Sequence, residues 1–459
     1  MSIAEVVPRI IESIFSNVSN PFEELDITIN VLENSRSFWS ECYQITFNSE
    51  KANHHIVSPL FVKIPKISAI NAALDPESFI ENCEILRKLT AQEITFYKDF
   101  AHYQFPDFPI PRFYYGESLE NEQRAGLVCE DFSSLAGSID FVPGFSDDQV
   151  LNLMKALAGF HAKTVQMSGQ IAWDKYDNAL YDEEYIRMLY NDTLQFEEIC
   201  QTRLSGKIQS VKHIFDENGV ENSNTLNEKL GLPFVLCHND LNASNILWNR
   251  ITGDIQAFID FQHVSKGAVT FDIIRILALG LSVEDRRDNT DRYLHHYYQC
   301  FQAHYSAPFS FEQLCDSFWA HFNFVNATSL FSLFYYYKMY KEERLDLKDD
   351  AVEREKKAEE ILRRTEDGAS PHTEKYTQDW CKAHLPAFIK KDRWPVSCPD
   401  LNPSRYVLTR RENLAEQNVQ LDCGLAAKGE SQPSSALTGF RDAVIVTCTR
   451  DASVIRVVM

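Results

Sequence analysis

A polar loop set between strand-like runs is the feature that most constrains this chain, over residues 235–262, VLCHNDLNASNILWNRITGDIQAFIDFQ. The run 234–237 leads into the loop 238–245, a second run covers 246–248, and a third covers 255–259 and ends on Asp260. Runs rich in β-branched and aromatic residues are typical of buried strands. The pattern therefore predicts a sheet whose loop ends carry two carboxylates, Asp240 and Asp260.

The polar residues at these loop ends meet the requirements of phosphoryl transfer. That reaction needs metal ions that bridge the nucleotide phosphates and a carboxylate beside the incoming hydroxyl group. Mg²⁺ prefers oxygen ligands, which Asn245 and Asp260 supply, and Asp240 remains to accept the substrate proton. The alternative is a polar turn between core strands, in which Asp and Asn serve only turn geometry.

The spacing His238-x-Asp240-x-x-x-x-Asn245, followed by a strand that ends in Asp260, resembles the catalytic and metal loops of kinases. The segments HNDLNASNILW, IDFQHVSKG and FDIIRILALGLSVEDRR resemble, more narrowly, the choline-kinase-like and ecdysteroid-kinase-like small-molecule kinases, in the branch expanded in nematodes. This resemblance spans residues 3–367. It implies ATP and Mg²⁺ as cofactors and a small-molecule alcohol as the acceptor. The implied fold is α+β and bilobal, protein-kinase-like, with a small antiparallel-sheet lobe and a larger, mainly helical lobe.

The resemblance also assigns residues to the nucleotide. Lys63 lies in the apolar run FVKI, where a buried lysine needs a partner. In the family this lysine reaches the phosphates and pairs with a glutamate of the following helix, expected over 76–103, which is Glu93 here. The alternatives on that helix are Glu81, Glu84 and Asp99. The segment from Glu130 to Phe132 lies where the family holds adenine through backbone groups.

One expected nucleotide element departs from the family. The hairpin segment 33–40, ENSRSFWS, has no glycine, whereas the family uses glycine there so that backbone N–H groups approach the phosphates. The alternative function is therefore a pseudokinase or ligand-binding scaffold without phosphotransfer. The catalytic loop lacks the arginine that protein kinases place after their histidine, and no activation segment with a phosphosite is recognisable after Asp260. Both features favour a small-molecule substrate over a protein substrate.

Several helices are expected in the larger lobe. Residues 271–277 begin a buried helix, on which we expect an ion pair between Asp272 and Arg275 that ties the helix to the catalytic loop. His161 is expected to be a hydrogen-bonding core residue, not a catalyst. Helices over 286–305, 310–340 and 349–364 are expected to wall the acceptor site.

Composition limits the class of partner. The formal charge of −21 argues against nucleic-acid binding. The 11 cysteines form no CxxC pair, which indicates reduced thiols, and no apolar run is long enough to span a bilayer, so we expect a cytoplasmic protein without membrane insertion. The oligomeric state and the acceptor stay open.

The expected domains are a nucleotide-binding lobe over 1–132, a catalytic and acceptor-binding lobe over 133–367, and a largely disordered tail over 368–459. Within the tail, residues 371–412 resemble the end of a mariner-type transposase core, whose metal-ligating aspartate matches Asp400. The two partner carboxylates have no counterpart, so we interpret this segment as a relic without activity.

Overall fold

The structure is a computed structural model that describes residues 3–32, 40–48, 56, 58–66, 76–121, 124–177, 183–215, 225–342, 349–368, 445–448 and 455–458. The chain divides into two compact units, Met1–Ala369 and Ser370–Met459. In the second unit, the described residues form an antiparallel pair, β11 (Ile445–Cys448) and β12 (Ile455–Val458). The transposase-like segment 371–412 lies outside the described residues.

The first lobe of unit 1 contains a five-stranded antiparallel sheet in the order β1-β2-β3-β5-β4. Its strands are β1 (Thr28–Val31), β2 (Ser40–Thr46), β3 (Leu60–Pro65), β4 (Phe113–Glu117) and β5 (Gly126–Glu130). The helix α1 (Ile3–Ile14) and the short α2 (Pro21–Glu24) belong to the same lobe.

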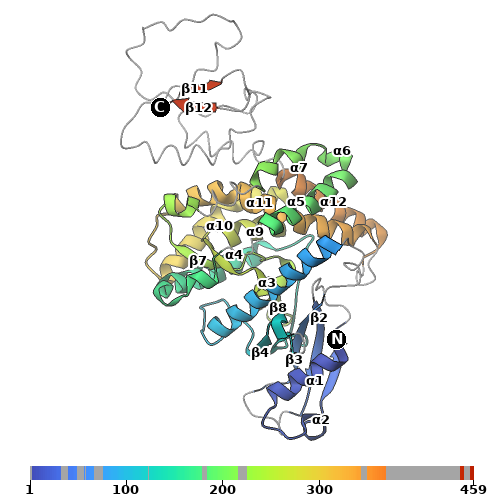
Figure 1. The fold of residues 1–459 in the computed structure, drawn as a ribbon. Coiled ribbons are helices and arrows are strands. Elements are labelled where there is room, and N and C mark those ends of the chain that lie inside the picture. Colours follow the sequence, from blue (N-terminus) through green and yellow to red (C-terminus); the bar gives the residue numbers. More distant parts are fainter. Residues whose placement is uncertain are drawn as a thin grey trace, which may run out of the picture. The chain divides into compact units, whose positions relative to one another are not determined.

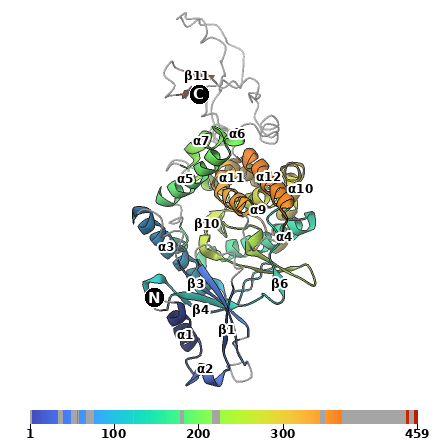
Figure 2. The ribbon, with the colours of Figure 1, turned by 90° about the vertical axis from the view of Figure 1, so that its right-hand side faces the viewer.

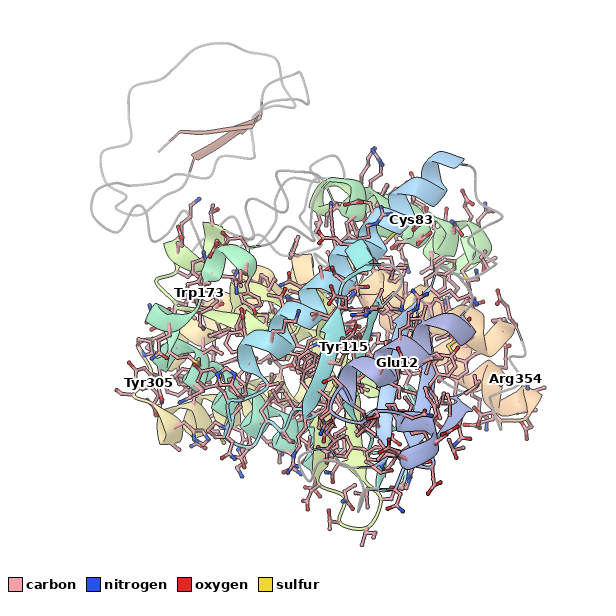
Figure 3. The ribbon with its side chains drawn as sticks, turned by 60° about the horizontal axis from the view of Figure 1, so that its bottom comes forward. Glu12, Cys83, Tyr115, Trp173, Tyr305 and Arg354 are labelled. Atoms are coloured by element: carbon pink, nitrogen blue, oxygen red, sulfur yellow. The ribbon has the colours of Figure 1, made fainter. Side chains whose placement is uncertain are left out.

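One face of this sheet packs against α1. Leu60, Val62 and Ile64 of β3 are buried in one apolar cluster with Ile10 of α1, and Tyr115 of β4 packs against that cluster. The helix α1 contacts β4, and Figure 3 labels Glu12 on α1 and Tyr115 on β4. Successive side chains of a strand point to opposite faces, so Lys63 points to the face of the sheet away from this cluster.

The helix α3 (Pro76–Phe100) connects the sheet to the second lobe, and Figure 1 shows it crossing between the two. Tyr97 stacks on Phe113 of β4 with a centroid separation of 5.6 Å, while Phe96 stacks on Phe261 of the second lobe at 4.0 Å. One helix therefore fixes the face of the sheet that carries Lys63 against the loop that follows Asp260. The helix α3 ends at Phe100, three residues before the end that the sequence predicts.

The second lobe is mainly helical. Its longer helices are α4 (Asp147–Gln166), α5 (Glu183–Ile199), α9 (Phe271–Gly280), α10 (Val283–His304), α11 (Phe311–Lys341) and α12 (Ala351–Gly368), and its short helices are α6 (Gln201–Leu204) and α7 (Lys207–Ser210). All ten residues of α9 are buried, because α9 packs against α10, α11 and α12 (Figure 2). The helix α10 begins three residues before the predicted start, since the Ser282 hydroxyl caps it by accepting from Asp285 N.

Two small sheets frame the polar loops. The strands β6 (Ala136–Gly137), β8 (Ile246–Asn249) and β9 (Ile255–Phe258) form one, and β7 (Phe234–Cys237) pairs with β10 (Ser265–Ala268) in the other. The predicted strand runs are confirmed, but they do not share a single sheet, because β10 supplies the partner of β7. The α+β, bilobal, kinase-like fold class is confirmed. Among the described helices, none combines the length and the apolar character that crossing a bilayer requires.

Candidate active site

Lys63 lies between two carboxylates that come from different parts of the chain. Its Nζ donates to Glu93 Oε2 of α3 at 2.8 Å and to Asp260 Oδ1, just after β9, at 2.5 Å. The side chains of Lys63 and Glu93 are 12% and 6% exposed, and that of Asp260 is 26% exposed. Glu93, the predicted partner of Lys63, thus lies beside it in the structure. Of the alternatives, Glu84 pairs with Arg87 on the surface and Asp99 pairs with Lys175.

The electrostatics of this triad follow from its burial. Burial alone lowers the pKa of Lys63, but Asp260 and Glu93 outweigh it and raise that pKa, so the ammonium group stays charged. Burial raises the pKa of Glu93 to about 7, with Lys63 opposing the shift. Burial raises the pKa of Asp260, but the Lys63 ammonium group outweighs burial, so the pKa of this carboxyl is lowered. Asp260 is therefore the carboxylate that is held ionised, as a ligand of a hard cation must be.

The catalytic loop is connected directly to the strand that carries Asp260. His238 Nε2 donates to Ile259 O at 2.9 Å, and His238 Nδ1 accepts from Asp240 N at 3.2 Å. Ile259 N also donates to Asn245 O at 3.0 Å. These contacts join residues 238, 240 and 245 to the residue that precedes Asp260, so the two polar loops predicted from the sequence meet at one place.

Asn245 and Asp240 are held in a fixed relation to each other. Asn245 Nδ2 donates to Asp240 O at 2.8 Å and to Asp240 Oδ2 at 2.9 Å. With its amide nitrogen engaged, Asn245 keeps its side-chain oxygen as the atom that can bind a cation. An amide oxygen and an ionised carboxylate make an oxygen donor set, so the chemistry of these residues fits Mg²⁺ with phosphate and water completing its coordination.

Both loops contain backbone in the left-handed region. Asn239 has φ 60° and Asp260 has φ 67°, conformations that cost free energy for residues other than glycine and that concentrate at functional sites. Asn239 is fixed by its side chain, because its Nδ2 donates to Ser265 Oγ at 2.8 Å and to His263 O at 3.0 Å. The contacts around both loops thus maintain a conformation that the local sequence does not favour.

The buried helix α9 anchors the catalytic loop, although not in the predicted way. The Asp272 carboxylate accepts from His238 N at 2.7 Å and from Asn239 N at 2.8 Å. The predicted pair between Asp272 and Arg275 is wrong, because Arg275 reaches out of its helix and donates to Asp240 Oδ1 at 2.8 Å. Sequence reasoning missed this contact. The available signal was a single arginine inside the apolar helix FDIIRILALG, which needs a partner by the logic applied to Lys63.

His161 has the environment that was expected for it. It is fully buried, and its Nδ1 forms a 2.8 Å hydrogen bond with Tyr297 OH. Its Nε2 lies 3.7 Å from Asp272 Oδ2. His161 is therefore a buried, hydrogen-bonded core residue that lies beside Asp272.

The segment assigned to adenine lies at the end of β5. Three of its backbone atoms have partners outside the segment: Glu130 N donates to Arg112 O, Asp131 N donates to Pro59 O, and Phe132 O accepts from Leu135 N and Ala136 N. A nucleotide base held here would therefore use other backbone atoms of the segment. Residues 33–39 of the glycine-free segment lie outside the described residues.

The wider of two cavities lies away from the residues that make these contacts. The cavity beside Lys63, Glu93 and Gln262 measures about 10 Å³. A wider cavity of about 720 Å³ is lined by the loop after α3 and by Lys155 of α4, and it contains none of the predicted site residues. The contacts around Lys63 connect chemically matched groups from distant segments, whereas the lining of the wider cavity shows no such convergence.

This chain is similar to known proteins over most of its length. A family model described as "Uncharacterized oxidoreductase dhs-27" (DUF1679) matches residues 58–375. The Caenorhabditis elegans "Uncharacterized kinase-like protein D1044.1" is 68% identical over 366 residues, which cover 79% of this chain and 97% of that protein. The Mus musculus "Ethanolamine kinase 1" is 48% identical over 44 residues, 10% of this chain and 12% of that protein.

Among solved structures, the choline kinase from Cryptosporidium parvum Iowa II covers 80% of this chain and 98% of its own, with 12% identity and a TM-score of 0.45. The family match contains all of the contacts of the candidate site and extends only a few residues into the transposase-like segment. The chain therefore belongs to the DUF1679 family, described as "Uncharacterized oxidoreductase dhs-27", and it has a kinase-like relative of nearly the same length as its own first unit.

Proposed function

We propose that this protein transfers the γ-phosphoryl group of Mg-ATP to a hydroxyl group of a small molecule. The observation that supports this most is the unbroken series of contacts from Lys63 through Asp260 and Ile259 to Asn245 and Asp240. Phosphoryl transfer depends on positioning and charge neutralisation more than on covalent chemistry. A cation, two metal-binding oxygens and a carboxylate at one place supply those needs.

Each residue has a role in this proposal. Lys63, oriented by Glu93, holds the nucleotide phosphates, and the segment from Glu130 to Phe132 seats adenine. Asn245 and Asp260 hold Mg²⁺, which neutralises negative charge on the transferred group when it is bound. Asp240 orients the acceptor hydroxyl group and accepts its proton.

The acceptor is a small-molecule alcohol in this proposal, and choline-like, sterol-like and other alcohols stay open. A local match to an ethanolamine kinase favours an amino alcohol as the first candidate to assay. A cytoplasmic location is a further prediction, which fractionation of cells would test.

The first experiment separates nucleotide binding from turnover. A thermal shift with ATP that requires Mg²⁺ is expected for the wild-type protein, and its absence would favour a scaffold that does not bind nucleotide. ATP consumption is then followed in a pool of alcohols. Binding without any turnover would identify a pseudokinase.

The second experiment tests Asp240. The Asp240→Asn variant is expected to lose about 10²- to 10⁴-fold in kcat, because the amide cannot accept the proton. Asp254→Asn is a matched control, since Asp254 is exposed in the turn between β8 and β9. An unchanged rate in the Asp240 variant would remove the assigned proton acceptor.

A further inference from the structure

Arg275 is a cation inside a helix that is otherwise almost entirely apolar. All ten residues of α9 are buried, and Arg275 is 9% exposed. A buried guanidinium group is costly unless it is paired and hydrogen-bonded. Its partners therefore indicate what this residue does.

The guanidinium group of Arg275 bridges α11 and the catalytic loop. Nη2 donates to Asp240 Oδ1 at 2.8 Å and to Ser332 Oγ at 3.2 Å, while Nη1 lies 3.4 Å from Ser329 Oγ. Ser329 Oγ donates its own hydrogen to Val325 O at 2.6 Å, which leaves a lone pair to accept from Arg275. The two serines of α11 thus hold the guanidinium group in place, and its other contact is with the Asp240 carboxylate.

Asp240 is consequently held through both of its oxygens. Arg275 contacts Oδ1, and Asn245 Nδ2 contacts Oδ2 at 2.9 Å. The side chain of Asp240 is 17% exposed, against 10% for Arg275. The exposed remainder of the carboxylate is what an acceptor hydroxyl group can reach.

The helix α9 acts on the loop at a second point. Asp272, one turn before Arg275, accepts from the backbone N–H groups of His238 and Asn239. One buried helix therefore fixes both the backbone that precedes Asp240 and the orientation of its carboxylate.

We infer that Arg275 is a positioning residue for the proposed phosphoryl transfer, and that it orients the Asp240 carboxylate toward the acceptor hydroxyl group. This inference rests on the proposed function. In the step itself, the acceptor oxygen forms the bond to the γ-phosphorus, the bond from that phosphorus to the leaving oxygen of ADP breaks, and the acceptor proton passes to Asp240. Arg275 neither gains nor loses a proton, because a guanidinium group stays charged in proteins.

A planar guanidinium group can satisfy the carboxylate and both serines at once, which the single ammonium group of lysine cannot do. Misplacing a catalytic group by about 1 Å can cost roughly 10²-fold in rate. We therefore expect kcat for the Arg275→Ala variant to fall by about 10²-fold, with the KM for ATP nearly unchanged because Lys63 and the metal ligands are untouched. Arg275→Lys should retain only part of the wild-type kcat.

Chemical rescue distinguishes positioning from a purely structural role. Free guanidinium ion at millimolar concentration should restore part of the kcat of Arg275→Ala, since the ion can occupy the place between Asp240 and the serines. The matched control is Arg286→Ala, because Arg286 pairs with Asp367 and both side chains are 5% exposed. That variant should melt at a lower temperature but keep its kcat, with no response to guanidinium.

The outcomes separate the two proposals. A wild-type protein that turns over no alcohol overturns the proposed function and this inference together, before any variant is made. With an active wild type, a folded Arg275→Ala variant with unchanged kcat overturns the inference alone. A loss that guanidinium does not rescue and that Arg286→Ala shares does the same. Where Arg275→Ala does not fold, a folded Arg275→Lys variant with full kcat overturns the inference, and a reduced kcat at an unchanged melting temperature supports it.

Discussion

Replacing Lys63 with methionine tests the buried triad directly. Methionine keeps the apolar stem of the side chain and removes the ammonium group that contacts Glu93 and Asp260 at 2.8 and 2.5 Å. Removal of one partner from a buried ion pair costs about 3–5 kcal/mol, because the remaining charge is buried without compensation. Here two carboxylates remain, although the partial exposure of Asp260 favours the lower part of that range.

The expected change is large enough to measure by urea denaturation and by melting. Unit 1 spans 369 residues, for which an unfolding entropy of about 2.1 cal/mol/K per residue converts the loss into a melting temperature lower by about 4–6 °C. The loss should grow from pH 5 to pH 8. Without Lys63, burial and Asp260 raise the pKa of Glu93 unopposed by the ammonium group. Glu93 is therefore protonated at pH 5 in the variant, and it regains its repulsion with Asp260 as rising pH removes that proton.

A matched control and a second substitution make the test specific. Lys66→Met removes the partner of Glu41, but these side chains are 48% and 33% exposed, so the expected loss is about 0–1 kcal/mol. Adding Glu93→Gln to Lys63→Met should recover stability, because it removes one of the two uncompensated charges. A loss below about 1 kcal/mol for Lys63→Met at pH 8 would refute the reasoning, since it is the value of an exposed pair.

Three further predictions concern the surroundings of the site. Asp272→Ala should lower the free energy of unfolding by about 2–4 kcal/mol in urea denaturation, because two buried backbone N–H groups lose their acceptor; wild-type stability would contradict the anchoring role. Asn245→Ala should raise the Mg²⁺ concentration needed for half-maximal ATP stabilisation by at least about 10-fold, and an unchanged requirement would remove Asn245 from the metal site. For Glu93 the folded pKa of about 7 exceeds the ordinary 4.5, so the folded state binds more protons and stability falls as pH rises between those values. The stability of the wild type relative to Glu93→Gln should therefore decrease from pH 5 to pH 8, and a pH-independent difference would contradict the assigned burial effect.

Part of the site could be predicted because its chemistry is local in sequence. The spacing of Asp240 and Asn245 lies within one loop, and Asp260 follows a recognisable strand. Lys63 was identifiable as a lysine among apolar neighbours, and the resemblance named Glu93 over Asp99 and Glu84. Lys63 is the residue whose type is costly at its position without a partner, whereas motif spacing and the resemblance identify the other site residues.

The remaining features depend on packing between distant segments. Spacing along one helix favours Asp272 as the partner of Arg275, whereas the fold places Asp240 Oδ1 2.8 Å from the guanidinium group. Strand pairing was similarly hidden, because β7 pairs with β10 and not with β8. The contact between Arg275 and Asp240 and the pairing of β7 with β10 cannot be predicted from a short segment, since each depends on how α9 and the two small sheets pack.

The most direct test of the central claim is ³¹P NMR of the wild-type protein with ATP, Mg²⁺ and a pool of small-molecule alcohols. We expect ADP and a phosphomonoester to appear in equal amounts, both to require Mg²⁺, and neither to form with Asp240→Asn. Full retention of ATP with every alcohol, or release of inorganic phosphate without a phosphomonoester, would contradict it.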